Sequence, residues 1–160
     1  ISGSRLGFLA RSRPDDDDDG ETIRALEAQY ISLYRAETLL DMGSSSATLA
    51  RGLARTAQNI GLRFAEDQLV VPGAGLGMVH MLRYDSASIT QIAWMHAEYG
   101  PMALCISPQR AGNSRDIVNE KRHGMNIAWW QHDGYQFVLI GRNPEQDMTA
   151  SARALQSALS

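Results

Sequence analysis

Cysteine, basic charge and long apolar runs are all scarce in this chain, and each scarcity excludes a class of protein. The single cysteine, Cys105, rules out an internal disulfide framework. It leaves the redox compartment open, because a lone buried thiol is tolerated anywhere. The net charge of −3 and the isoelectric point near 5.8 lack the basic excess of a general nucleic-acid-binding protein. No apolar run reaches the roughly 20 residues that a membrane-spanning helix requires.

The composition that remains is that of an ordinary folded domain. The 160 residues are 44% hydrophobic and 21% charged, which allows one core of ordinary size without disulfide or metal staples. We expect a single domain over residues 21–160. Because the sequence does not begin with methionine, we expect a processed chain or a fragment, with room for a membrane segment outside it.

Residues 1–20 are interpreted as a leader and an acidic linker. Residues 1–14 carry three arginines, little periodicity and a terminal Pro14, which fits a flexible leader or a juxtamembrane remnant. Residues 15–19 are five consecutive aspartates. Adjacent like charges do not converge on one ion unaided, so we interpret them as a solvated linker before a helix and not as a cation site or an interaction tail.

Two amphipathic helices are predicted before the sheet. Residues 21–42 repeat apolar side chains on one side and end before Gly43 and three serines. The serines cap a second helix over about residues 47–60, which Gly61 ends. Its apolar stripe is Leu49, Leu53, Ala57 and Ile60. The short turn between the helices favours a helical hairpin, or two helices on one face of a sheet.

From residue 62 onward the apolar period changes to two, which predicts strands. A short strand is expected at residues 69–71, and longer ones at residues 78–84, 89–97 and 102–107. Gly73, Gly75 and Gly77 follow the short strand, but a strand and not a helix comes next, so we interpret them as turn glycines and not as a phosphate-binding loop. Residues 109–119 are polar and are expected to form a loop.

Residues 122–142 carry the strongest local signal. Two runs of alternating apolar residues flank Asp133 and Gly134. An Asp-Gly pair suits a two-residue hairpin turn, because both central positions need a positive φ. Tyr135, Phe137 and Leu139 then share one face of the second strand and point at a core.

The last helix is expected to have Asn143 as its N-cap, Pro144 at its first position and Gln146 at its third. Its apolar stripe is Met148, Ala152, Leu155 and Leu159. Short connections between consecutive strands favour antiparallel pairing. The predicted fold class is therefore α+β: an antiparallel meander of about five strands, with two N-terminal helices and one C-terminal helix packed on it.

Five residues are candidates for reactive chemistry: Cys105, His80, His96, His123 and His132. A nucleophilic thiol needs a nearby histidine and an orienting carboxylate, yet Cys105 lies in an apolar strand, where cysteines are usually inert packing. The histidines show no paired zinc-ligand spacing, although His80 and His96 could meet across neighbouring strands. We therefore predict no catalytic, cofactor-binding or metal-ligating residues and leave the binding residues unassigned.

Tryptophan and methionine leave two alternatives open. Trp129 and Trp130 point to opposite faces of one strand, so at most one belongs to the main core. The other either packs under a helix or is exposed as a binding surface. Methionines gather on adjacent predicted strands, where they either fill the core or line a pliable pocket for a hydrophobic ligand. These methionines are Met78, Met81, Met95 and Met102.

Three segments together resemble one bacterial family. They are LYRAETL at residues 33–39, IAWMHAEYGPMALCI at residues 92–106, and HGMNIAWWQHDGYQFVLIG at residues 123–141. In order and spacing they are similar to the extracytoplasmic portion of membrane-spanning anti-sigma factors, the proteobacterial proteins often described as transmembrane transcriptional regulators. The resemblance covers residues 21–159. Its motifs belong to the fold and carry no reactive residues, so it transfers no catalytic positions.

The resemblance implies a periplasmic sensory or regulatory domain of a single-pass inner-membrane protein. In that architecture a cytoplasmic, often zinc-binding helical segment holds the sigma factor, and one membrane helix joins it to this domain. Residues 1–160 contain neither part, so sigma-factor binding is not assigned to them. A signal would release an extracytoplasmic-function sigma factor and so control transcription, with a periplasmic protein or a protease as a further partner.

Two other hypotheses come from the residues themselves. One is a small redox or hydrolytic enzyme that uses Cys105 with His96 or His80. The other is a periplasmic domain that binds a small ligand or a lipid on the methionine-rich sheet.

Overall fold

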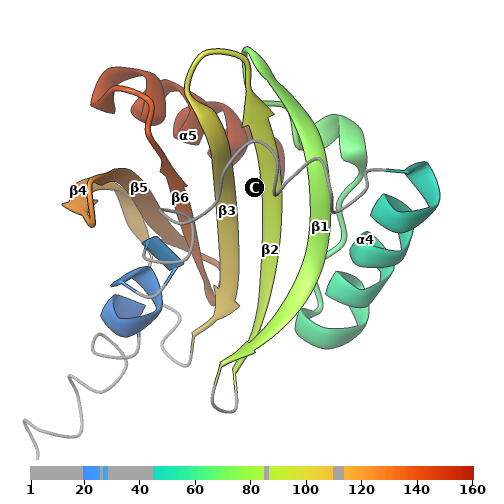
Figure 1. Cartoon of the computed structure of the whole chain (residues 1–160). Coiled ribbons are helices and arrows are strands. Elements are labelled where there is room, and N and C mark those ends of the chain that lie inside the picture. The colour runs from blue at the N-terminus through green and yellow to red at the C-terminus, as the bar shows by residue number, and fades with distance from the viewer. Residues whose placement is uncertain (1–19, 26, 29–44, 85–86, 110–113) are drawn as a thin grey trace, which may run out of the picture.

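A computed structural model describes residues 20–25, 27–28, 45–84, 87–109 and 114–160. Their main feature is a six-stranded antiparallel sheet in the order β1-β2-β3-β6-β5-β4 (Figure 1). The strands are β1 (Ala74–Tyr84), β2 (Ala87–His96), β3 (Gly100–Pro108), β4 (Arg115–Arg122), β5 (Met125–His132) and β6 (Tyr135–Gly141). The helices are α4 (Ser46–Ile60), the short 3₁₀ helix η1 (Glu66–Gln68) and α5 (Glu145–Leu159). Residues 20–25 and 27–28 are also helical, and we call them the N-terminal helix. The predicted α+β class is confirmed.

The sheet consists of two three-stranded meanders joined along β3 and β6. In this pairing Cys105 lies opposite Val138 and Ile106 lies opposite Phe137. The expected single meander of about five strands is therefore wrong in one respect: the chain passes from β3 to the far edge of the sheet before it returns. The additional strand is β4, which the polar residues 109–119 had led us to expect as a loop. Among the described residues β4 pairs with β5 alone, and charged side chains are usual on such an edge strand.

The first predicted strand, at residues 69–71, is also wrong. These residues form a loop whose apolar side chains are nonetheless buried, with Leu69 1% and Val71 2% exposed. The carbonyl oxygen of Leu69 accepts a hydrogen bond from the indole Nε1 of Trp94 at 2.8 Å. Gly75 and Gly77, expected in a turn, lie inside β1, whose register with β2 shifts between residues 76 and 78.

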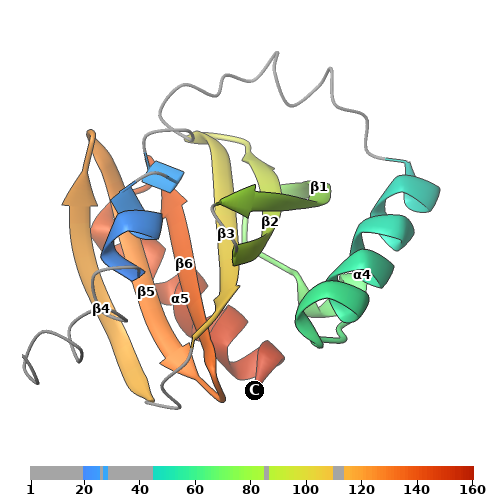
Figure 2. The ribbon, with the colours of Figure 1, turned by 90° about the horizontal axis from the view of Figure 1, so that it is seen from below.

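Helices cover both faces of the sheet. α4 and α5 pack on one face, and the N-terminal helix packs on the other (Figure 2). The larger core lies under α4 and α5 and includes Leu49, Trp94, Leu104, Trp130, Leu139, Met148 and Leu155. The smaller core lies under the N-terminal helix and includes Ile23, Ala28, Cys105, Ile127, Trp129 and Val138. The described part of the first predicted helix therefore lies on the opposite face of the sheet from α4, so the expectation of two helices on one face is wrong for these residues. Residues 29–42 of that predicted helix, like residues 1–19, lie outside the described residues.

Local signals set the ends of α4 as expected. The hydroxyl of Ser45 accepts from the backbone N–H of Thr48 at 3.2 Å, and Gly61 ends the helix with φ 78°. Within the helix, Gly52 allows an unusually close approach to β1. A Cβ atom at this position would lie 2.0 Å from the carbonyl oxygen of Val79.

The cap of α5 differs from the prediction. The helix begins at Glu145 with Pro144 at the N-cap, and the Asn143 side chain does not cap it. Asn143 is buried instead, and its Nδ2 lies 3.6 Å from the sulfur of Met102. The predicted apolar stripe is confirmed, since Met148, Ala152 and Leu155 are fully buried and Leu159 packs against the same core.

The predicted β5–β6 hairpin is confirmed, with φ 54° at Asp133 and 85° at Gly134. Phe137 and Leu139 enter the larger core, and Trp130 stacks on Phe137 with ring centroids 5.1 Å apart. No helix in the described part of the chain combines the length and the apolarity needed to cross a bilayer.

Candidate functional site

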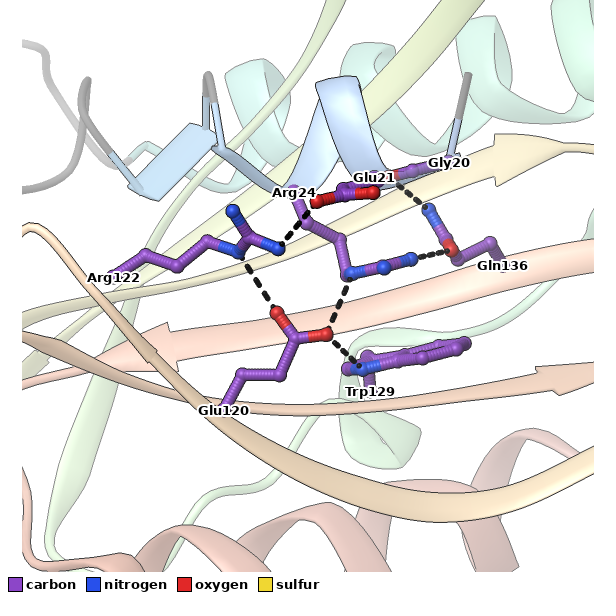
Figure 3. A network of polar contacts seen from close by, with 7 residues as sticks. All are labelled: Gly20, Glu21, Arg24, Glu120, Arg122, Trp129 and Gln136. Atoms are coloured by element: carbon purple, nitrogen blue, oxygen red, sulfur yellow. Dashed lines mark hydrogen bonds and ion pairs between the residues drawn. The ribbon is translucent and has the colours of Figure 1, made fainter. Parts of the chain in front are cut away.

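A group of polar side chains lies between the N-terminal helix and the sheet, and we call it the helix–sheet network (Figure 3). Its members come from the N-terminal helix, from β4 and from the β5–β6 hairpin. They are Gly20, Glu21, Arg24, Glu120, Arg122, Trp129 and Gln136. Glu120 and Arg122 are two positions apart in β4, so the strand period directs both toward the N-terminal helix.

Arg24 is the central member of this network. Its side chain is nearly buried, and its Nη1 donates to Oε1 of Gln136 at 2.9 Å. Its guanidinium carbon lies 4.0 Å from the centre of the Trp129 ring, in cation–π geometry. Its Nε lies 3.2 Å from Oε1 of Glu120, within ion-pair distance but without the alignment of a hydrogen bond. Arg24 therefore attaches the N-terminal helix to β4, β5 and β6 together.

Glu120 connects this arginine to a second one. Its Oε1 accepts from the indole Nε1 of Trp129 at 2.9 Å, and its Oε2 accepts from Nε of Arg122 at 2.9 Å. Arg122 also reaches Glu21 at 3.1 Å. Burial alone would raise the pKa of Glu120, but the hydrogen bond from Arg122 and the charges of Arg24 and Arg122 together lower it. Burial lowers the pKa of Arg24, and the nearby Glu120 carboxylate only partly offsets this.

A cavity of about 170 Å³ opens beside the helix–sheet network. Eight residues line it: Gly20, Glu21, Arg24, Gln109, Arg115, Trp129, Gln131 and Gln136. Arg115 is the second guanidinium near Trp129, with its carbon 5.5 Å from the ring centre. Apart from the indole, the lining side chains are polar or charged, so the cavity suits a polar ligand and not a lipid chain.

A second polar cluster lies on the same face of the sheet, and we call it the thiol cluster. It consists of Glu27 from the N-terminal helix and of three residues paired across strands, His80, Gln91 and Cys105. Gln91 donates to Oε2 of Glu27 at 3.0 Å, and its Oε1 lies 2.6 Å from Nε2 of His80. The Glu27 carboxylate lies close enough to the thiol of Cys105 for each group to shift the pKa of the other.

The thiol cluster disfavours the thiolate that the enzyme hypothesis needs. Burial and the nearby Glu27 charge raise the pKa of Cys105 well above its usual range, and the thiol is 1% exposed. Burial likewise raises the pKa of Glu27. His80 reaches the thiol only through Gln91, so no imidazole is placed to take the thiol proton directly.

The remaining candidate histidines are far from this cluster. His80 lies opposite Gln91 while His96 lies opposite Ala74, six positions along β1, so the expected meeting of His80 and His96 is wrong. At about 3.3 Å per strand residue this places them roughly 20 Å apart. His96 accepts hydrogen bonds from the backbone N–H groups of Glu98 and Tyr99. His123 and His132 lie at hairpin ends. Among the described residues no histidine, cysteine or carboxylate group of three could hold a metal ion.

The structure shows where the two adjacent tryptophans and the four methionines lie. Trp130 belongs to the larger core, and Trp129 packs under the N-terminal helix. Met81 and Met102 fill the larger core, while Met78 and Met95 form a small cluster with Ala93.

Local sequence reasoning did not find the helix–sheet network, because its partners are far apart in the chain. Arg24 and Gln136 are separated by 112 residues. The only local signal is the Glu120–Arg122 pair, two charges of opposite sign on one face of an edge strand.

No known protein family, curated protein or solved structure matches this chain.

Proposed function

We propose that this chain is the periplasmic sensory domain of a membrane-spanning anti-sigma factor, and that the N-terminal helix is the element whose attachment changes with the signal. The resemblance described above supports the first part. Two of its three segments form β2, β3, β5 and β6, the four central strands of the sheet. Residues 33–39, the third segment, lie outside the described residues.

The observation that carries the second part is the polar attachment of the N-terminal helix. Only Ile23 and Ala28 of its described side chains enter an apolar core, whereas Glu21, Arg24 and Glu27 bind the sheet through charged groups. In a partly buried ion pair the cost of desolvation is similar in size to the attraction between the charges. The net contribution of such a pair to stability is therefore small. A signal with a modest preference for one state therefore shifts the balance between the attached and released helix.

The test uses the full-length gene product in its own host. We expect Arg24→Met to release the helix and to change transcription of sigma-dependent genes without a signal. Arg55→Met, the same replacement at an exposed position of α4, is the matched control. Transcript profiling of both variants gives the comparison, and purification of the intact protein shows whether a sigma factor is retained. The proposal fails if no sigma factor copurifies and the two transcript profiles agree.

A small-ligand-binding domain is the second candidate, because the cavity beside Trp129 has a polar lining and an open side. The exposed position of Glu21 and Arg115 makes it reachable from solvent. The two candidates are compatible, since a sensor needs a ligand site.

A further inference from the structure

We infer that the cavity beside Trp129 binds a small organic carboxylate, which Arg24 and Arg115 recognise by charge. Binding itself is independent of the anti-sigma proposal. Its role as the signal rests on that proposal.

The first argument is the charge around the cavity. Both acidic groups nearby are already engaged: Glu120 with Arg122 and Trp129, and Glu21 with Arg122. Arg115 has no ion pair within the described residues and faces the same indole as Arg24. Two guanidinium groups thus border one cavity, and within the described residues only that of Arg24 is paired with a carboxylate. An entering anion would pair with Arg115.

The second argument is the donor capacity of Arg115. Its side chain is exposed, lines the cavity and makes no hydrogen bond within the described residues, so its N–H groups are open to a ligand oxygen. Carboxylates suit this role because a guanidinium presents its N–H groups in a fork that matches two carboxylate oxygens.

The third argument concerns the rest of the ligand. The amides of Gln109 and Gln131 line the cavity, and neither side chain has a hydrogen-bond partner in the part of the chain that the structure describes. Amide groups both donate and accept, so they suit hydroxyl or carbonyl groups on the ligand. The cavity of about 170 Å³ resembles in size the roughly 150 Å³ cavity that holds a benzene molecule. A compound of roughly six to ten non-hydrogen atoms therefore fits, which is larger than phosphate.

The experiment compares matched pairs that differ in charge alone. The purified chain is titrated with succinate and succinamide, and with benzoate and benzamide, and binding is followed by tryptophan fluorescence and calorimetry. We expect saturable binding of at least one acid and at least tenfold weaker binding of its neutral counterpart, because a charge-assisted hydrogen bond is lost.

Arg115→Gln provides the site test, because within the described residues this exposed side chain has no hydrogen-bond or ion-pair partner and only the cation–π contact with the indole. We expect it to weaken acid binding at least tenfold at an unchanged melting temperature. Arg55→Gln on α4 removes another exposed arginine on the opposite face and should leave binding unchanged. The inference is overturned by no saturable acid binding, by equal affinity for acid and neutral partner, or by inorganic phosphate as the one anion bound. Equal binding to wild type and Arg115→Gln overturns it as well. Because the readout is binding to the isolated chain, its failure is distinct from that of the transcription test.

Discussion

Replacing Arg24 with methionine should detach the N-terminal helix while the sheet stays folded. The substitution keeps the aliphatic contact but removes the hydrogen bond to Gln136, the ion pair with Glu120 and the cation–π contact with Trp129. Breaking a buried ion pair costs about 3–5 kcal/mol when the other charge is left alone. Here Glu120 keeps Arg122 and Trp129, so we expect about 2–3 kcal/mol.

Hydrogen exchange measures this directly, because locally opening units exchange according to their own free energy. A loss of about 2–3 kcal/mol lowers protection of residues 20–28 roughly 30- to 160-fold, at about 1.36 kcal/mol per factor of ten. Protection in β2, β3 and β6 should change little. The same replacement at the exposed Arg55 of α4 is the control.

A double-mutant cycle with Glu120→Gln isolates the pairwise contribution. We expect the two changes together to cost about 0.5–3 kcal/mol less than their sum, since they share one interaction. Two results would refute the reasoning. One is protection of residues 20–28 in Arg24→Met within about threefold of the wild type, which is below 1 kcal/mol. The other is an equal loss of protection across the whole sheet.

Three further predictions concern the helices and the thiol cluster. Gly52→Ala gains about 1 kcal/mol of helix propensity, but its Cβ would meet the Val79 carbonyl at 2.0 Å. Overpacking costs about 1–3 kcal/mol, so after the propensity gain the net loss is up to about 2 kcal/mol. Calorimetry should therefore show a melting temperature lowered by up to roughly 8 °C, and a rise would contradict the packing. Burial raises the pKa of Glu27 above the usual 4.5, so the folded chain holds this proton more tightly. The stability present below pH 4.5 is then lost as the pH rises through the raised pKa, and denaturant titrations of Glu27→Gln should lack that decline. Finally, maleimide should label Cys105 at the rate of unfolding, because the thiol is buried and its pKa is raised. Labelling at the rate of a free thiol would contradict this.

Elements with local signals could be predicted from the sequence. The β5–β6 hairpin was found because Asp133 and Gly134 carry the required positive φ. α4 was found because Ser45 and Gly61 satisfy its end groups within a few residues. A second two-residue turn joins β4 to β5, with positive φ values of 51° at His123 and 74° at Gly124. This turn is a local signal that predicts a strand before it, which is β4.

The parts that sequence reasoning missed depend on distant partners. Asn143 has the chemistry of an N-cap, but burial beside Met102 directs its side chain inward. The order of the sheet depends on which strand joins β3, and short connections alone do not determine this. The helix–sheet network requires the N-terminal helix to meet strands about a hundred residues away, and no periodicity encodes that meeting.

The pairing of Arg24 with Gln136 has a consequence for how the chain is made. Ribosomes synthesise roughly 5–20 residues per second, so the 112 residues between these two side chains take roughly 6–22 s to appear. During that time the N-terminal helix exists without β6, the last of the strands that it contacts. The earliest segment of the domain to be synthesised is thus among the last to be placed, and its charged side chains are open to chaperones or other binding partners until β6 has emerged.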